Sequence, residues 1–264
     1  MPGAVFLWKH AGMTTSLIIA AVLSGSFIGA VLGLIGAGGA MITVPILIYI
    51  FDFTPIQATT AALAVVFLAA IAGLIPKLKS NDVLIKEALT IWALGLLTNI
   101  GLGAIADSLP DTFILIGFSV VLVGAGISML RAPIKDHPER KISPIYLIAL
   151  SLFIGALTGL FGIGGGFVAI PVLVLFFHTP QNRAAGTSLL IIVLNCATAF
   201  LAKYQSWPTI NWHYPVLIAL VAILVARISS KLAPKTPTIH LKKAFAYLLF
   251  VIAGFTLITK IFGS

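Results

Sequence analysis

Charged residues are scarce in this chain, and acidic residues most of all. Only 9% of the 264 residues are charged, seven of them acidic, whereas 60% are apolar. A soluble domain carries about a quarter of charged residues, so this composition excludes one and is typical of a polytopic membrane protein. The formal charge of +9 is confined to short segments between long apolar runs. It indicates orientation in a lipid bilayer, and we expect no nucleic-acid partner.

Residues that catalyse reactions or bind metals are also rare in the apolar runs. The single cysteine, Cys196, has no second thiol for an intrachain disulfide, and all five histidines lie in expected loops or at the edges of spans. No carboxylate falls at membrane depth, which argues against a proton relay through a buried acid. No cluster of histidine, cysteine and carboxylate residues occurs either. We therefore expect a protein that is not an enzyme and has no metal and no cofactor.

Glycine, in contrast, is abundant and occurs in two dense runs, GAGG over 36–39 and GIGG over 162–165. Each run follows a long apolar stretch, and each is followed six residues later by a proline. A shift of 126 residues superposes 29–47 on 155–173 with nine identities in nineteen positions. The chain is therefore an internal duplication.

A dense glycine run in an apolar segment predicts a break in the helix, because glycine gives up the most backbone entropy and buries no side chain. Within a bilayer, such a break is tolerated only where protein or a polar cavity surrounds it, and matching breaks in two halves point to a transporter site. A nucleotide-binding loop is excluded because no strand, polar loop or acidic ribose partner surrounds the runs. Glycines at helical spacing instead indicate close helix packing: Gly25, Gly29, Gly33, Gly155 and Gly159.

The lengths of the apolar segments predict the helices, since a spanning helix needs ~17–25 apolar residues. In order, we expect segments over 15–35, 40–51, 58–76, 87–106, 112–130, 143–161, 167–177, 184–202, 213–232 and 242–261. The two short segments after the glycine runs are half-spans. Each forms a hairpin with the segment before it, and the sequence leaves open whether these hairpins are re-entrant or spanning.

The expected fold class is an all-α polytopic membrane protein of two inverted repeats, each of about five helical segments, with the glycine-broken half-helices meeting near the midplane. Residues 1–130 form the N-terminal repeat, which opens with the glycine-broken hairpin 15–51 and continues with three helices. Residues 131–142 form a cytoplasmic linker, and residues 143–264 form the C-terminal repeat with hairpin 143–177. An odd number of crossings in each half makes the repeats inverted.

The loop charges predict the orientation in the membrane. Loops on alternate sides place thirteen basic and four acidic residues on one side, and three of each on the other. The basic side faces the cytoplasm by the positive-inside rule, so both termini lie outside.

Neutral polar residues follow the glycine runs and, with the runs, form the candidate substrate-binding site. A half-helix start carries unpaired N–H groups and about half a positive charge, which suits an oxyanion without a lysine or arginine in the membrane. Each polar residue taken alone is more often a link between helices than a ligand contact. The candidates are Gly38, Gly39, Ala40, Gly164, Gly165, Gly166, Thr60, Thr187, Ser188 and Asn195.

Two lysines, Lys77 and Lys203, also match at the 126-residue shift, each at the end of an expected span. Two interpretations remain open for them. They attract anions to the two mouths of a pathway, or they anchor their helices at the membrane interface with extended side chains.

The segments GLIGAGGAMITVPIL and GLFGIGGGFVAIPVL, with RAAGTSLLII after the second, resemble the sulfite exporter TauE/SafE family. The resemblance covers roughly residues 12–261. It implies a bacterial inner-membrane transporter that exports sulfite or a small organosulfonate anion by alternating access around a midplane site. An anion channel of the same fold is the alternative, and a membrane scaffold without transport is a further one. The sequence assigns no oligomeric state.

The two copies of the family signature differ in polarity. The first has Ala40 where the second has Gly166, and alanines at 61–62 where the second has Thr187 and Ser188. The second half is therefore expected to supply more of the polar contacts to the substrate.

The orientation can be tested by cysteine-accessibility labelling. We expect residues 131–142 and 233–241 to react from the cytoplasm, and residues 1–12 and Ser264 from outside, because of the charge asymmetry of the loops. Labelling of residue 136 and Ser264 from the same face would refute the inverted repeats.

Overall fold

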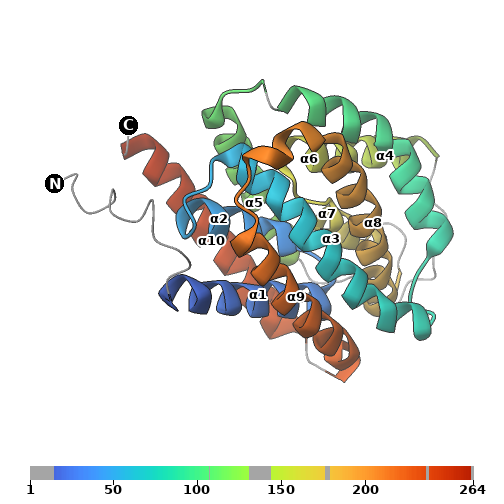
Figure 1. Cartoon of the computed structure of the whole chain (residues 1–264). Helices are drawn as coiled ribbons and strands as arrows, with labels where there is room; N and C mark the ends of the chain where they lie inside the picture. The colour runs from blue at the N-terminus through green and yellow to red at the C-terminus, as the bar shows by residue number, and fades with distance from the viewer. Residues whose placement is uncertain (1–14, 107, 131–143, 176–178, 236–237, 263–264) are drawn as a thin grey trace.

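The computed structural model describes residues 15–106, 108–130, 144–175, 179–235 and 238–262 (Figure 1). This part of the chain is helical and contains no strand. Its helices are α1 (Thr15–Ile35), α2 (Gly39–Tyr49), α3 (Pro55–Lys79), α4 (Ile85–Ala106), α5 (Asp111–Leu130), α6 (Pro144–Phe161), α7 (Gly166–Leu175), α8 (Gln181–Ala202), η2 (Tyr204–Thr209), α9 (His213–Leu232), η3 (Ala233–Lys235) and α10 (Thr238–Phe262). The ten expected segments are confirmed, with ends that differ by a few residues. The expected linker 131–142 lies outside the described residues.

The helix lengths agree with a membrane protein. Within the described ranges, five helices are long and apolar enough to cross a bilayer, namely α1, α3, α4, α8 and α9. The helices α2 and α7, with 11 and 10 residues, are about 15–17 Å long at 1.5 Å per residue. They reach across roughly half of a hydrocarbon core.

The start of α3 differs from the expected position at residue 58. The helix begins at Pro55 because Thr54 and Gln57 form a capping box. The Gln57 backbone N–H donates to the Thr54 hydroxyl (3.4 Å), and the Thr54 backbone N–H donates to the Gln57 side-chain oxygen (3.2 Å). Proline suits the first turn because its nitrogen carries no hydrogen that would need an acceptor there. The helix therefore starts three residues before the expected position.

The duplication is visible in the backbone at the end of each half-helix. The N–H of Phe53 donates to the oxygen of Leu47 (3.0 Å), and the N–H of Thr179 donates to the oxygen of Leu173 (2.9 Å). Both residues of the second bond lie 126 positions after those of the first. The residues on either side of the two connections are therefore joined by equivalent backbone hydrogen bonds.

The helices of the two halves pack in equivalent but exchanged pairs. Helix α1 lies along α9, and its counterpart α6 lies along α4, the counterpart of α9 (Figure 1). Helix α3 packs on α9 as α8 packs on α4, and the pairs α3/α8 and α5/α10 join the halves directly. Each glycine-broken hairpin is thus attached to the other half of the chain.

Glycines at helical spacing make these pairs close, as the sequence indicated. A methyl group added to α1 would lie only 2.5–2.6 Å from a backbone oxygen of α9 at three successive glycines. The facing residues are Gly25 with Ile218, Gly29 with Ala222 and Gly33 with Ala226. On the second hairpin, Gly155 and Gly159 meet the α4 backbone at Gly95 and Asn99 in the same way.

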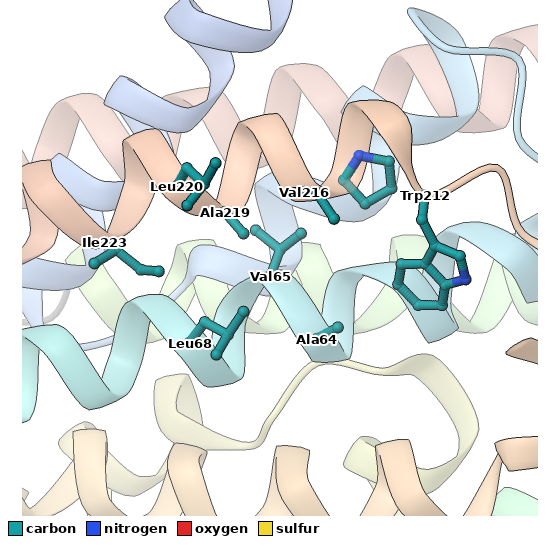
Figure 2. Close-up of a pocket in the computed structure, with 9 residues that line it drawn as sticks. Ala64, Val65, Leu68, Trp212, Val216, Ala219, Leu220 and Ile223 are labelled. Atoms are coloured by element: carbon teal, nitrogen blue, oxygen red, sulfur yellow. The ribbon is translucent and has the colours of Figure 1, made fainter.

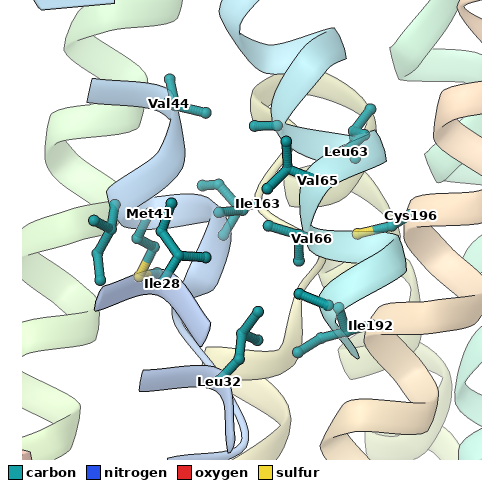
Figure 3. Close-up of a cluster of buried hydrophobic side chains, with 14 of the residues drawn as sticks. Ile28, Leu32, Met41, Val44, Leu63, Val65, Val66, Ile163, Ile192 and Cys196 are labelled. Atoms are coloured by element: carbon teal, nitrogen blue, oxygen red, sulfur yellow. The ribbon is translucent and has the colours of Figure 1, made fainter. Parts of the chain in front are cut away.

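The apolar core lies between the hairpins and the α3/α8 pair. Figure 3 shows Ile163, from the glycine run of the second half, between Met41 and Val44 of α2 and Val65 and Val66 of α3. All five side chains are buried. The second glycine run therefore contributes to the same buried cluster as the first half's short helix and long helix.

The close packing can be tested by adding one methyl group. Gly29→Ala should destabilise the protein, because the methyl would lie 2.6 Å from the Ala222 oxygen. Gly124→Ala is the matched control in α5, since nothing lies within 4 Å of its added methyl. The control should leave the free energy of unfolding unchanged or raise it by up to ~1 kcal/mol, because alanine has a higher helix propensity than glycine. Thermal unfolding in detergent measures both, and equal midpoints for the two variants would contradict the packing.

Candidate functional site

Both long hairpin helices end in a glycine of left-handed backbone conformation. Gly36 has φ 81° and donates its N–H to the Leu32 oxygen (2.9 Å), and Gly162 has φ 66° and donates to the Thr158 oxygen (2.9 Å). This is the αL cap, in which the residue after the last helical one is left-handed and is usually glycine because glycine has no Cβ. The predicted helix breaks are therefore present in both halves.

The short helices begin directly after these caps. Gly38, Gly164 and Gly165 also have positive φ values of 87°, 73° and 71°, which L side chains rarely adopt. Helix α2 then starts at Gly39 and α7 at Gly166, in agreement with the starts expected near Ala40 and Gly166. We call residues 36–39 the first tip and residues 162–166 the second tip.

Each tip packs on the long helix of the other half. A methyl group on Gly36 would lie 2.7 Å from the Ala185 oxygen of α8, and one on Gly162 would lie 2.8 Å from the Thr59 oxygen of α3. Thr59 and Ala185 are themselves 126 residues apart. The contacts are therefore exchanged between the halves, and glycine is required at both positions by φ and by space.

The second tip reaches the middle of α8. A methyl on Gly166 would contact Ile192 and the Ser188 hydroxyl, and this hydroxyl donates to the Gly166 carbonyl oxygen (2.9 Å). In the first half, Ala40 and Met41 at the start of α2 are at most 1% exposed. The N–H groups of a first helical turn have no acceptor within the helix. Here these donors lie inside the protein.

The predicted threonines have hydroxyl partners within the protein. Buried Thr60 donates to the Ile56 oxygen (2.8 Å) on its own helix. Buried Thr187 donates to the Arg183 oxygen (2.7 Å) and accepts from the Leu84 N–H (2.9 Å), so it links α8 to the start of α4. With Ser188 bonded to Gly166, all three hydroxyls must exchange a partner to bind a ligand.

Asn195, in contrast, has an unused donor. It meets Asn99 of α4, whose side-chain Nδ2 donates to the Asn195 backbone oxygen (3.1 Å) and to the Thr198 hydroxyl (2.9 Å). The Asn195 Nδ2 and the Asn99 Oδ1 have no hydrogen-bond partner, although the two residues are at most 1% exposed. The residue after Asn195 on α8, Cys196, contacts the second tip, because its sulfur lies 2.9 Å from a methyl group added at Gly164. Asn99 was missing from the predicted site because no spacing along the chain relates two helices 96 residues apart.

A cavity between α3 and α9 has an almost entirely apolar lining and offers no unpartnered donor like that of Asn195 (Figure 2). Its volume is about 90 Å³, and Leu68, Val216 and Leu220 on its rim are exposed. The only side chain with a polar group there is Trp212, whose indole N–H donates to the Trp207 oxygen (3.1 Å). An oxyanion would find no donor in this cavity, which opens toward the lipid-facing side.

The two matched lysines are both inside the protein. Lys77 is 2% exposed and Lys203 is 3% exposed. The interpretation that they extend into the interface as anchors is therefore wrong, because an extended ammonium would be exposed to water. Their burial at equivalent helix ends was not evident from the sequence, which shows only that both terminate apolar spans.

A helical bundle with two glycine-broken hairpins packed crosswise is the architecture of a polytopic membrane transporter. The chain belongs to the sulfite exporter TauE/SafE family, whose family model matches residues 21–256.

Three relatives are described as probable membrane transporter proteins. One from Xylella fastidiosa (strain Temecula1) is 28% identical over 76% of this chain and 78% of its own length. MJ0441 from Methanocaldococcus jannaschii is 28% identical over 90% and 94%, and YunE from Bacillus subtilis is 29% identical over 84% and 91%. The similarity spans both halves of the duplication.

The link between α8 and α4 can be tested with Thr187→Val. We expect a loss of about 1 kcal/mol of stability, since valine keeps the shape but removes the acceptor for the Leu84 N–H. Thr90→Val is the control, because the exposed Thr90 hydroxyl only donates to Lys86 on its own helix. Equal unfolding midpoints for the two variants would show that the link contributes nothing.

Proposed function

We propose that this protein exports sulfite or a small organosulfonate anion across a bacterial inner membrane by alternating access. The observation that carries the proposal is the pair of helix starts at duplicated positions, each after a left-handed glycine cap and each inside the protein. Membership of a sulfite exporter family supports the class of substrate.

The anion is proposed to bind at the N–H groups of the two tips, near the bilayer midplane. Unpaired N–H groups and the helix dipole stabilise a negative charge, and they do so most strongly where water is excluded. Glycine lets the anion approach the backbone closely. The proposed contacts are Gly38, Gly39 and Ala40 from the first half, and Gly164, Gly165 and Gly166 from the second.

The second half is proposed to add the side-chain contacts that distinguish one anion from another. Asn195 offers a buried N–H donor beside the second tip, whereas the equivalent position of the first half is Ala69. Thr187 and Ser188 lie on the same helix, α8, and contribute when their hydroxyls exchange partners; the first half adds Thr60 of α3 in the same way. An unused donor favours an oxygen acceptor, which sulfite and sulfonates provide.

Alternating access is favoured over an open channel by the burial of both tips. Each tip packs against the other half, so an anion reaches it only when one hairpin moves relative to its exchanged partner helix. The exchanged packing agrees with inverted repeats, in which movement of either half opens one side. In this proposal both termini lie outside, the linker is cytoplasmic, and residues 1–130 and 143–264 are the two moving units.

Flux measurements in proteoliposomes separate the alternatives. A carrier should give sulfite transport that saturates with concentration and shows counterflow, whereas an anion channel of the same fold should show no counterflow. A scaffold should give no flux. Absence of sulfite and sulfonate flux from correctly folded protein would refute the proposed function.

The contact at Asn195 gives a quantitative test. Asn195→Ala should lower the apparent affinity for sulfite about fivefold, which corresponds to ~1 kcal/mol for one neutral hydrogen bond. The fold should be retained, because Asn99 donates to the backbone oxygen of residue 195, which alanine keeps. Asn182→Ala is the control, since Asn182 is exposed at the start of the same helix. An unchanged affinity in Asn195→Ala would remove Asn195 from the site.

A further inference from the structure

Lys77 is a buried basic residue that the proposed site at the tips does not include. Its side chain is 2% exposed, and its Nζ has no hydrogen-bond partner. A buried ammonium loses its hydration, and an anion that replaces the water stabilises its charged form. The unpartnered Nζ therefore indicates a ligand of negative charge.

Lys77 lies beside the part of α8 that holds the first tip. Its Cβ is 3.2 Å from a methyl group added at Gly186, and the preceding residue, Ala185, is the one that contacts Gly36. Lys77 and the first tip thus pack against two consecutive residues of α8, Gly186 and Ala185. An anion held by Lys77 would be close to the route to that tip.

The connection between α3 and α4 covers this position. The Asp82 N–H donates to the Lys77 carbonyl oxygen (2.9 Å), and the Asp82 carbonyl oxygen contacts an added methyl at Gly186. The Asp82 carboxylate accepts a hydrogen bond from the Ser80 hydroxyl (2.7 Å) and interacts electrostatically with Lys77 without a hydrogen bond to it. Asp82 is only half-buried, so water screens its charge.

The other half of the duplication also has a buried lysine at the end of its long helix. Lys203 is buried where α8 ends, and the following segment, η2, contacts the start of α3 through the bond from Gln57 Nε2 to the Thr209 oxygen (2.7 Å). Each long helix thus has a buried lysine in its last turn or directly after it. A helix-end anchor in lipid would not require burial at both places.

We propose that Lys77 binds a small oxyanion at the junction of α3, α4 and α8, as a station between the first tip and the solution at that end of α3. The proposal rests on the proposed function and extends it with a second anion site. The anion carries the negative charge that the ammonium lacks inside the protein, and it leaves toward the tip when the hairpin moves. Oxygen atoms of a sulfite or sulfonate group form charge-assisted hydrogen bonds with a lysine.

The test compares Lys77→Met with Lys79→Gln in the full-length purified protein, with sulfite as the probe. Lys79 is exposed two residues further along the same helix, so its variant controls for the loss of one positive charge. Lys77→Met should lose most of the thermal stabilisation by sulfite and weaken its binding about tenfold, while Lys79→Gln behaves as wild type. Without sulfite, Lys77→Met should be as stable as wild type or more stable, because methionine needs no partner.

A second variant keeps the proposal testable if Lys77→Met does not fold. Asp82→Asn keeps the backbone bond to Lys77 and removes the competing carboxylate, so it should strengthen sulfite binding. Unchanged sulfite binding in Asp82→Asn, or wild-type binding in Lys77→Met, would overturn the site at Lys77 alone. If the wild-type protein is not stabilised by sulfite or sulfonates and does not transport them, the proposed function itself is refuted.

Discussion

A bilayer provides no water for backbone N–H and C=O groups, and this constraint governs how the helices of this chain can be interrupted. The two tips are interruptions that the protein itself encloses. Gly36 and Gly162 close the preceding helices with backbone hydrogen bonds, and each then packs on the long helix of the opposite half. The exchanged pairing of α1 with α9 and of α6 with α4 surrounds the breaks, so the polar backbone is shielded from lipid.

The two equivalent helix pairs that join the halves, α3 with α9 and α8 with α4, share this frame but differ in polarity. Between α9 and α3, the link is a Ser230 hydroxyl that donates to the Gly73 oxygen (2.7 Å). Between the equivalent helices α4 and α8, the link near mid-helix is the asparagine pair, which retains a donor and an acceptor without partners. The first link is satisfied and the second is not. A duplicated scaffold can thus satisfy the polar link in one of its two equivalent helix pairs while the other pair keeps buried polar groups without partners.

The fold could be predicted from the sequence because membrane helices are specified by local properties. Apolar length set the segments, and the glycine runs set the starts of α2 and α7 to within one residue. The start of α3 was wrong by three residues because the capping box at Thr54 and Gln57 precedes the apolar run. The pairing of Asn99 with Asn195 and the burial of Lys77 depend on which helices meet, and local patterns do not carry that information. The helix breaks were therefore predictable from the sequence, whereas the side-chain contacts between helices were not.

The crosswise pairing also affects how the protein is made. Helix α1 inserts first, but the glycine face that it presents has its partner in α9, with Gly25 facing Ile218. At synthesis rates of about 5–20 residues per second, α9 follows roughly 10–40 s later. During that interval α1 and the first tip lack their final neighbours, and the exposed backbone of the tip must be covered by lipid headgroups, water or the insertion machinery. The N-terminal half therefore completes its structure only after the C-terminal half has emerged, and neither half is a folding unit on its own.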